Sequence, residues 1–309
     1  MTGVPLRAPV LWATGLAPVR RFVTGSPLGR RVALRFVAGE SLEEGLAAAR
    51  SLDRRGIRAM LDHLGENVTS SGQASAAADG YVLALKRIHE AQGLDCNSAI
   101  KLTQLGLDRS LDLCLENAER VLAAAEAAGM LVMIDMESSE YVDRTLQVLR
   151  RVRERHPGVG VALQSYLRRT PEDVFRLPPE APVRLVKGAY LESPSVAYRR
   201  RGDVDRAFAV LFATLVERGH PVHVATHDPG LLAGAVRFVD RRGLDWKRVE
   251  LQMLYGIRRD LQRTYADRGY PVRAYVPYGA QWYPYLTRRL AERPANLWFF
   301  ASNLLRRTG

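Results

Sequence analysis

The segment Leu131-Val-Met-Ile-Asp135 decides the fold class of this 309-residue chain. Four apolar residues in succession are typical of a short strand that is buried on both faces, because a half-exposed strand alternates apolar and polar residues. Such strands occur in parallel sheets whose faces are covered by helices. The acidic residue that ends the segment falls where the strand would meet its following loop.

Seven further β-type runs accompany this segment, with longer helical patterns between them. The eight runs are Ile57–Leu64, Ser98–Leu102, Leu131–Asp135, Val159–Gln164, Val183–Lys187, Val222–Thr226, Val249–Met253 and Val272–Val276. Strands that alternate with helices indicate βαβ units and therefore a parallel α/β fold. Eight units within about 240 residues favour a closed (βα)8 barrel. An open, doubly wound sheet of similar strand count is the alternative.

The chain divides into three segments around this barrel. Residues 57–293 form the predicted barrel domain. Residues 1–56 precede it, and Ser41-Leu-Glu-Glu44 marks a helix start with Ser41 as N-cap and Glu44 at the capping-box position. We therefore expect an N-terminal helical arm. Residues 294–309 predict a short C-terminal helix that either packs against the barrel or lies on a membrane surface.

Composition limits the classes of protein to consider. The hydrophobic content of 47% excludes a disordered chain. Cys96 and Cys114 cannot form a disulfide framework, so we expect a reducing, cytoplasmic environment. The longest apolar run, Ala207–Val216, is too short to span a bilayer. The N-terminus also lacks the pattern of a signal peptide.

The net charge of +12 is unevenly divided along the chain. Residues 1–150 carry 17 Lys and Arg against 18 Asp and Glu, whereas residues 151–309 carry 28 against 15. A basic half suggests an anionic partner, which could be nucleic acid, a membrane surface, a phosphorylated cofactor or a carboxylate substrate.

Polar or ionisable residues stand at the C-terminal ends of all the predicted strands. In chain order, with one apolar neighbour, they are Glu66, Lys101, Asp135, Gln164, Arg184, Lys187, Tyr190, Thr226, His227, Gln252, Leu254, Tyr275 and Tyr278. Barrels of this type carry their function at that end. Charges inside apolar strands are costly unless they are paired. These residues are therefore either structural ion pairs or one convergent polar site.

Arg288 and Arg289 follow the eighth strand on one predicted helix. Adjacent helical residues diverge by about 100°, so the pair can hold one carboxylate from two sides. A solvated basic face is the alternative. A metal site is not expected in His220-Pro-Val-His223-Val-Ala-Thr-His227, because the first two histidines point to opposite strand faces and the last two lie roughly 13 Å apart. Neither a GxGxxG nor a P-loop motif is present.

Read in order, the strand-end segments resemble the proline dehydrogenase family over about residues 35–300. The matching motifs are Ile100-Lys-Leu-Thr-Gln-Leu-Gly106, Ile134-Asp-Met-Glu137, Leu163-Gln-Ser-Tyr-Leu167, Arg184-Leu-Val-Lys-Gly-Ala-Tyr190, Ala225-Thr-His-Asp228, Tyr275-Val-Pro-Tyr-Gly279 and Tyr285-Leu-Thr-Arg-Arg-Leu-Ala-Glu292. The resemblance is to the compact monofunctional bacterial form. It implies a distorted (βα)8 TIM barrel with non-covalent FAD, which oxidises L-proline to (S)-1-pyrroline-5-carboxylate and passes the electrons to a membrane quinone.

The resemblance also implies roles for individual residues. Asp135 and Arg184 look like the catalytic pair, and Glu66 resembles the loop acid that gates the pocket. The substrate-binding residues would be Lys101, Arg288 and Arg289 at the carboxylate, with Tyr190, Leu254, Tyr275 and Tyr285 around the ring. The FAD contacts would be Met136, Gln164, Val186, Lys187, Gly188, Ala189, Thr226, His227 and Glu292. Leu191 departs from the pattern, because some relatives carry Trp there.

These residue types suit the implied chemistry. A permanently charged carboxylate needs a cationic clamp, and a cation beside the flavin would stabilise charge that develops on it. The resemblance places the protein in the cytoplasm, peripherally on the inner membrane, and leaves open a partner 1-pyrroline-5-carboxylate dehydrogenase that takes the product. Two other functions stay open: another FAD barrel similar to methylenetetrahydrofolate reductase, and nucleic-acid binding. Nucleic-acid binding is not expected, since no recognition motif is present.

Overall fold

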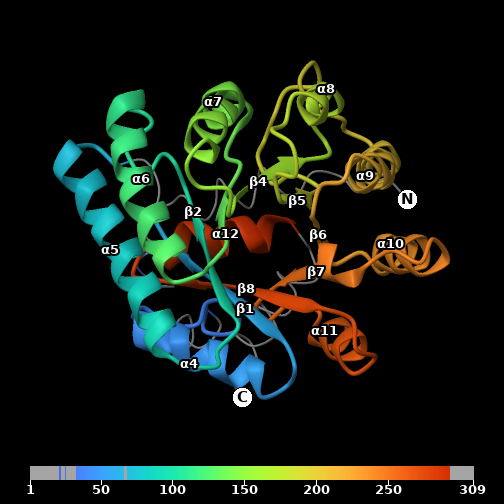
Figure 1. Ribbon diagram of the computed structural model, residues 1–309, viewed down its shortest axis with the longest axis horizontal. Helices are drawn as coiled ribbons and strands as arrows, with labels where there is room; N and C mark the ends of the chain where they lie inside the picture. The colour runs from blue at the N-terminus through green and yellow to red at the C-terminus, as the bar shows by residue number, and fades with distance from the viewer. Residues whose placement is uncertain (1–20, 22–24, 26–32, 66–67, 293–309) are drawn as a thin grey trace.

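Eight parallel strands close into a barrel in chain order (Figure 1). The computed structural model describes residues 21, 25, 33–65 and 68–292, with the backbone alone for residues 288–292. The strands are β1 (Arg58–His63), β2 (Cys96–Ile100), β3 (Val132–Ile134), β4 (Val159–Gln164), β5 (Val183–Val186), β6 (Val222–Ala225), β7 (Val249–Leu254) and β8 (Val272–Tyr278). Strand β1 pairs with β8, which puts Arg58 opposite Arg273. This closure confirms the (βα)8 barrel and excludes the open sheet, which would keep two free edges.

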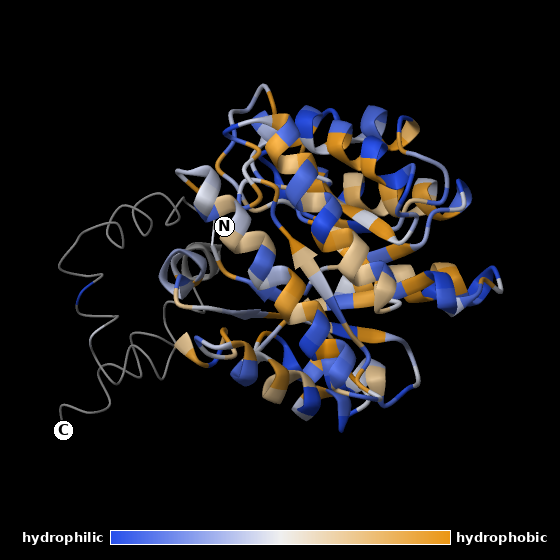
Figure 2. Cartoon of the chain, turned by 60° about the vertical axis from the view of Figure 1, so that its left-hand side comes forward, coloured by the Kyte–Doolittle hydropathy of each residue, from blue (hydrophilic) through white to orange (hydrophobic). Residues whose placement is uncertain are grey.

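Helices surround the barrel and bury one face each (Figure 1). They are α4 (Leu42–Asp53), α5 (Ser71–Glu90), α6 (Leu111–Ala127), α7 (Val142–Arg153), α8 (Thr170–Phe175), α9 (Arg201–Glu217), α10 (Pro229–Arg241), α11 (Arg259–Ala266) and α12 (Trp282–Glu292), with 3-10 turns η1 (Ser139–Tyr141) and η2 (Trp246–Arg248). Helix α7 buries Val142, Leu146 and Leu149, which follow one another at helical spacing. Figure 2 shows hydrophobic and hydrophilic residues in turn along the helices. Within residues 33–65 and 68–292, none of the helices could span a membrane.

Helix α4 is the predicted helix of the N-terminal arm. Its capping box is present, since Ser41 Oγ accepts from the Glu44 N–H at 3.2 Å and the Glu44 carboxylate accepts from the Ser41 N–H at 2.9 Å. The helix packs against β1 and β8. In a regular barrel the helix that follows β8 would lie there.

Helix α12 lies instead over the C-terminal ends of the strands. Its residues Tyr285 and Leu286 pack with Leu64 and Ile257, which come from the loops after β1 and β7. The distortion of the barrel therefore consists of one helix leaving the ring and an N-terminal helix closing the gap. It brings the Arg288–Arg289 segment of α12 onto the same end of the barrel as the strand-end residues. The predicted C-terminal helix over 294–309 lies outside the described residues.

Strand β3 is buried on both faces, as predicted. Val132 and Ile134 belong to the core between the strands and the helices, whereas Met133 belongs to a separate cluster with Met60 and Ala99 inside the barrel. These interior residues are small or flexible, and they leave room for polar side chains at the barrel axis.

Seven of the eight predicted strands differ from the observed ones by one or two residues at an end, and the difference at β2 bears on the site. Strand β2 ends at Ile100, so Lys101 begins the following turn and does not lie within the strand. Leu102, the apolar residue that suggested a longer strand, is fully buried in that turn, as is Leu105 beyond it. Burial of a loop thus imitated the pattern of a strand.

Candidate active site

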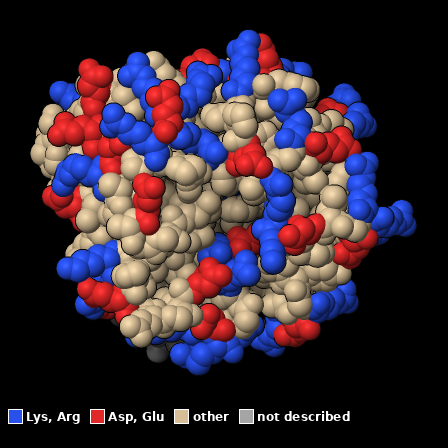
Figure 3. Space-filling model, viewed as in Figure 1, with Lys and Arg blue, Asp and Glu red and all other residues tan. Residues whose placement is uncertain are grey.

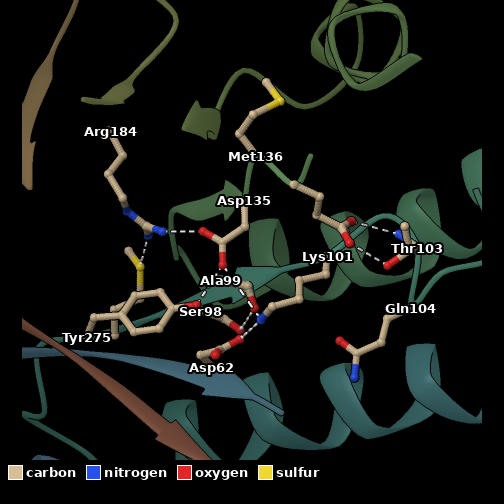
Figure 4. A network of polar contacts seen from close by, with 12 residues as sticks. Asp62, Ser98, Ala99, Lys101, Thr103, Gln104, Asp135, Met136, Arg184 and Tyr275 are labelled. Carbon is tan, nitrogen blue, oxygen red and sulfur yellow. Dashed lines mark hydrogen bonds and ion pairs between the residues drawn. The ribbon is translucent and has the colours of Figure 1, made fainter. Parts of the chain in front are cut away.

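Side chains from four parts of the barrel meet at the Asp135 carboxylate, which comes directly after β3 (Figure 4). Lys101 follows β2, whereas Arg184 lies within β5 and Tyr275 within β8. One carboxylate oxygen accepts from the Arg184 guanidinium on β5. The other accepts from the Tyr275 hydroxyl on β8 at 2.6 Å and lies 3.7 Å from Lys101 Nζ. The structure therefore brings these four predicted site residues together, although Asp135 and Tyr275 alone are 140 residues apart in the chain.

Asp62 on β1 is a member of this site that the sequence reasoning missed. Its carboxylate binds the Lys101 ammonium, and the side chain is 1% exposed (Figure 4). An acidic residue within the apolar run that forms β1 was the available signal. Glu66, the acidic residue predicted at this strand end, lies outside the described residues.

Burial and neighbouring charges shift the pKa values of Lys101, Asp62 and Tyr275 in this site. Burial lowers the pKa of Lys101, but the charges of Asp62 and Asp135 outweigh it and raise that pKa well above its usual value. Burial raises the pKa of Asp62 against the pull of Lys101. Burial and the two carboxylates also raise the pKa of Tyr275, so its phenol stays neutral and donates to Asp135.

A second group of predicted residues lies at the ends of β4 and β5. Gln164 Nε2 donates to the carbonyl oxygens of Met136 and Glu137, both at 3.0 Å. The side-chain oxygen of Gln164, Oε1, is buried and has no hydrogen-bond partner among the described residues. Gly188 has φ +120°, and a Cβ there would overlap the Tyr166 ring, so only glycine fits.

Lys187, at the end of β5, lies in a cluster of opposite charges. Its ammonium is 2.5 Å from Asp205 and 3.2 Å from Asp228. Burial opposes ionisation of Asp228, but Arg201 and Lys187 hold the pKa of that carboxyl well below its usual range. The carboxylate also caps α10, where it accepts from the Gly230 and Leu231 backbone N–H groups.

Thr226 and His227 follow β6, as predicted. His227 Nε2 accepts from the Leu254 backbone N–H at 2.9 Å, and Thr226 Oγ1 accepts from the Asp228 backbone N–H at 3.2 Å. This links the predicted cofactor contacts on β6 to the predicted substrate contact at the end of β7. Val186 and Ala189 lie beside Lys187 and Gly188 in the β5 segment.

The remaining predicted residues are placed less completely. Tyr285 is buried on α12 and Tyr190 is half-buried in the loop after β5. For Arg288, Arg289 and Glu292 the structure describes the backbone of α12 alone. The strand-end residue Tyr278 does not join the site, because its ring stacks on His63 at 5.2 Å and faces α4.

The three histidines from 220 to 227 have three separate partners. His220 bonds the Ala181 carbonyl, His223 lies 3.0 Å from the Gln252 amide, and His227 accepts from Leu254. Across the ranges that the structure describes, no group of three or more His, Cys, Asp or Glu side chains is placed to hold a metal ion.

Comparison with known families assigns the chain. The family model for proline dehydrogenase matches residues 45–302. The chain belongs to the proline dehydrogenase family. This confirms the family and the enzyme class that the strand-end motifs indicated.

Named proline dehydrogenases are similar over nearly their whole length. The proline dehydrogenase of Deinococcus radiodurans is 41% identical over 89% of this chain and 90% of its own. Proline dehydrogenase 1 of Bacillus subtilis is 37% identical over 92% of this chain and 93% of its own.

Among solved structures, proline utilization A (PutA) of Bdellovibrio bacteriovorus, inactivated by N-propargylglycine, superposes with a TM-score of 0.79. It is 24% identical over 85% of this chain and 33% of its own, so this chain spans about a third of that polypeptide. This likeness bears on the fold, and it agrees with the closed barrel.

Proposed function

We propose that this protein is a FAD-dependent proline dehydrogenase that oxidises L-proline to (S)-1-pyrroline-5-carboxylate. The observation that carries the proposal is the convergence of Lys101, Asp135, Arg184 and Tyr275 at the C-terminal end of the barrel, in a member of this family. A carboxylate paired with a guanidinium, beside an ammonium group and a neutral phenol, suits a small amino acid that carries both an amine and a carboxylate.

The residues present fit a flavin. The buried side-chain oxygen of Gln164 needs a hydrogen-bond donor, and the oxidised isoalloxazine ring carries one N–H group. Gly188 has a backbone conformation and a contact with the Tyr166 ring that admit only glycine, so a side chain there would displace the segment that follows β5. FAD would be held by this segment together with Lys187, Thr226 and His227, and when bound it supplies the acceptor for the substrate hydride.

The substrate carboxylate would be bound by Lys101, Arg288 and Arg289. The raised pKa of Lys101 keeps its ammonium charged, so it suits binding an anion and not removing a proton. Tyr190, Leu254, Tyr275 and Tyr285 would surround the ring. Asp135 accepts hydrogen bonds from Arg184 and Tyr275 and lies 3.7 Å from Lys101 Nζ, and its carboxylate would stabilise the positive charge that develops on the substrate nitrogen as the hydride leaves.

The spectrum of the bound flavin tests the proposal. The purified protein is expected to show a flavin absorption that bleaches anaerobically with L-proline and not with D-proline. Colourless protein that takes up no FAD would refute it, and oxidation of reduced nicotinamide without a response to L-proline would favour a methylenetetrahydrofolate reductase-like enzyme. Asp135→Asn is expected to slow the bleaching. Asp108→Asn removes an exposed carboxylate that also accepts from a tyrosine hydroxyl, at 2.7 Å, and is the matched control.

We propose a quinone as the electron acceptor and the cytoplasmic membrane face as the site of transfer. Turnover with a ubiquinone or menaquinone analogue should exceed turnover with dioxygen, and the reverse result would contradict the proposal. Lys and Arg lie interspersed with Asp and Glu on the face in Figure 3, which argues against the nucleic-acid alternative. Transfer of the product to a 1-pyrroline-5-carboxylate dehydrogenase would appear as a shortened lag in a coupled assay.

A further inference from the structure

A column of buried polar side chains continues from Arg184 through the inside of the barrel. It consists of His223 on β6, Gln252 and Glu250 on β7, and Arg273 on β8. Arg273 also binds Asp95, before β2, at 2.8 Å, and the Ala59 carbonyl at 2.7 Å. The proposed reaction uses none of these residues directly. Burying them without partners would be costly, so their contacts define what they do.

Gln252 joins this column to Arg184. It is 3% exposed, and its carbonyl oxygen accepts from Arg184 Nε at 2.9 Å. Its amide nitrogen donates to Glu250 at 2.8 Å and lies 3.0 Å from His223 Nδ1. A guanidinium can only donate and a carboxylate can only accept, so this amide has one orientation that satisfies both neighbours.

The neighbours of Gln252 hold that orientation in turn. Burial lowers the pKa of His223 to about 4, so its ring is neutral and can accept from the amide. Glu250 Oε1 also accepts from Arg273 Nε at 2.8 Å. Hydrogen bonds therefore connect Arg273 to Arg184 through Glu250 and Gln252.

The Arg184 guanidinium is held along each of its edges. One terminal nitrogen binds Asp135, the other contacts Met60 Sδ, and Nε binds Gln252. Its centre lies 5.1 Å from the middle of the Tyr275 ring. Neither Met60 nor Gln252 has a part in the proposed reaction, and of the two Gln252 accepts through an amide oxygen, so it can orient the guanidinium without taking part in substrate binding.

We propose that Gln252 is a positioning residue, which sets the orientation of the Arg184 guanidinium toward the flavin and Asp135. The inference rests on the proposed function. A cation that stabilises developing charge acts only from a defined position, and misplacement of such a group by about 1 Å can cost about 100-fold in rate.

Two substitutions separate positioning from packing. Gln252→Leu keeps the volume but leaves Arg184 Nε and Glu250 without their partner. Gln252→Glu keeps the shape, and its protonated acid can still accept from Arg184 while donating to Glu250. When that acid ionises it meets the Glu250 carboxylate and competes with Asp135 for Arg184. The rate of this variant relative to wild type should therefore fall as pH rises.

Asn117→Leu is the matched control. Asn117 is a buried amide, 1% exposed, that donates to the Leu105 carbonyl at 3.1 Å between α6 and the loop after β2. Its loss should cost stability without moving Arg184. A merely structural role for Gln252 predicts that its variants behave like this control.

The experiment compares these variants with wild type in the FAD-loaded enzyme. The readouts are the anaerobic rate of flavin reduction by L-proline, its KM and pH profile, and the flavin midpoint potential measured without proline against a reference dye. Gln252→Leu should lower the limiting rate about 10- to 100-fold with little change in KM, and shift the potential to more negative values. Asn117→Leu should change neither quantity.

Distinct results overturn the two proposals. An unchanged potential and limiting rate in Gln252→Leu would overturn the role of Gln252, as would a pH-independent ratio for Gln252→Glu. A wild-type flavin that ignores L-proline would overturn the proposed function, and the potentials would still decide about Gln252. A wild type that takes up no flavin would overturn both.

Discussion

Replacing the buried carboxylate of Glu250 by an amide should destabilise the barrel in a pH-dependent way. Glu250 accepts from Arg273 at 2.8 Å, from Arg58 at 3.2 Å and from Gln252 at 2.8 Å, and its side chain is 9% exposed. Burial alone would raise its pKa. Arg273, together with His223 and Gln252, outweighs burial and holds the pKa at about 2, against a usual value of 4.5.

The size of the effect follows from that difference in pKa. Each unit corresponds to about 1.4 kcal/mol, so ionised Glu250 contributes roughly 3 kcal/mol to the free energy of unfolding at neutral pH. In Glu250→Gln, Arg273 keeps its contacts with Asp95 and the Ala59 carbonyl. The loss in the free energy of unfolding should therefore not exceed the roughly 3–5 kcal/mol that is typical when a buried charge loses its partner. For a chain of this size the melting temperature should fall by about 5–10 °C.

The sign of the pH dependence is determined by the lowered pKa. A carboxyl whose pKa is depressed in the folded state stabilises it above the unfolded pKa, and this stabilisation is lost as pH falls through the folded value. The difference between wild type and Glu250→Gln should therefore be constant near neutral pH. It should begin to shrink below about pH 4.5 and reach roughly half near pH 3.

Urea unfolding followed by far-ultraviolet circular dichroism at several pH values measures this difference. Glu217→Gln is the control, because Glu217 pairs with Arg242 at 2.7 Å while both side chains are 52% exposed. Such a surface pair contributes less than about 1 kcal/mol. A loss in Glu250→Gln no larger than in the control, or a loss that does not depend on pH, would refute the reasoning.

Three further outcomes are expected. His156 follows α7 and contacts two glutamates of α6 at 2.8 and 2.9 Å, and these hydrogen bonds outweigh burial and raise its pKa. His156→Gln should lower the free energy of unfolding by up to about 1 kcal/mol at pH 6, and by less as pH rises above the raised pKa. Urea unfolding measures this, and an equal loss at pH 9 would contradict it. Gly188→Ala should weaken FAD binding, because the added carbon overlaps the Tyr166 ring. Flavin retention on gel filtration measures this, and full retention would contradict the proposed role of the Gly188 segment in holding FAD. Arg288→Ala and Arg289→Ala should each raise KM for L-proline roughly 30-fold or more with FAD retained, and unchanged kinetics in both would remove the carboxylate clamp.

The site was predictable where its residues interrupt an apolar strand or end it. Asp135 and Arg184 stand out because a charge in a buried strand needs a partner. Asp62 has the same signal inside β1, but Glu66, in the loop after that strand, was predicted in its place. Gln252 stands out in no such way, because a neutral amide in a strand has many possible partners.

The sequence by itself determined the number and type of the strands, and it placed the ionisable residues at one end of them. Parallel strands share an orientation, so residues at their C-terminal ends must gather at one end of the barrel. Tertiary structure decided the pairings. Closure of β1 on β8 brings Arg58 to Glu250 over 192 residues, and Arg184 reaches Met60 over 124. Local pattern cannot predict such contacts, because they depend on which inward-facing side chains meet at the barrel axis. It also could not foresee that α4 takes the place beside β8 while α12 covers the strand ends.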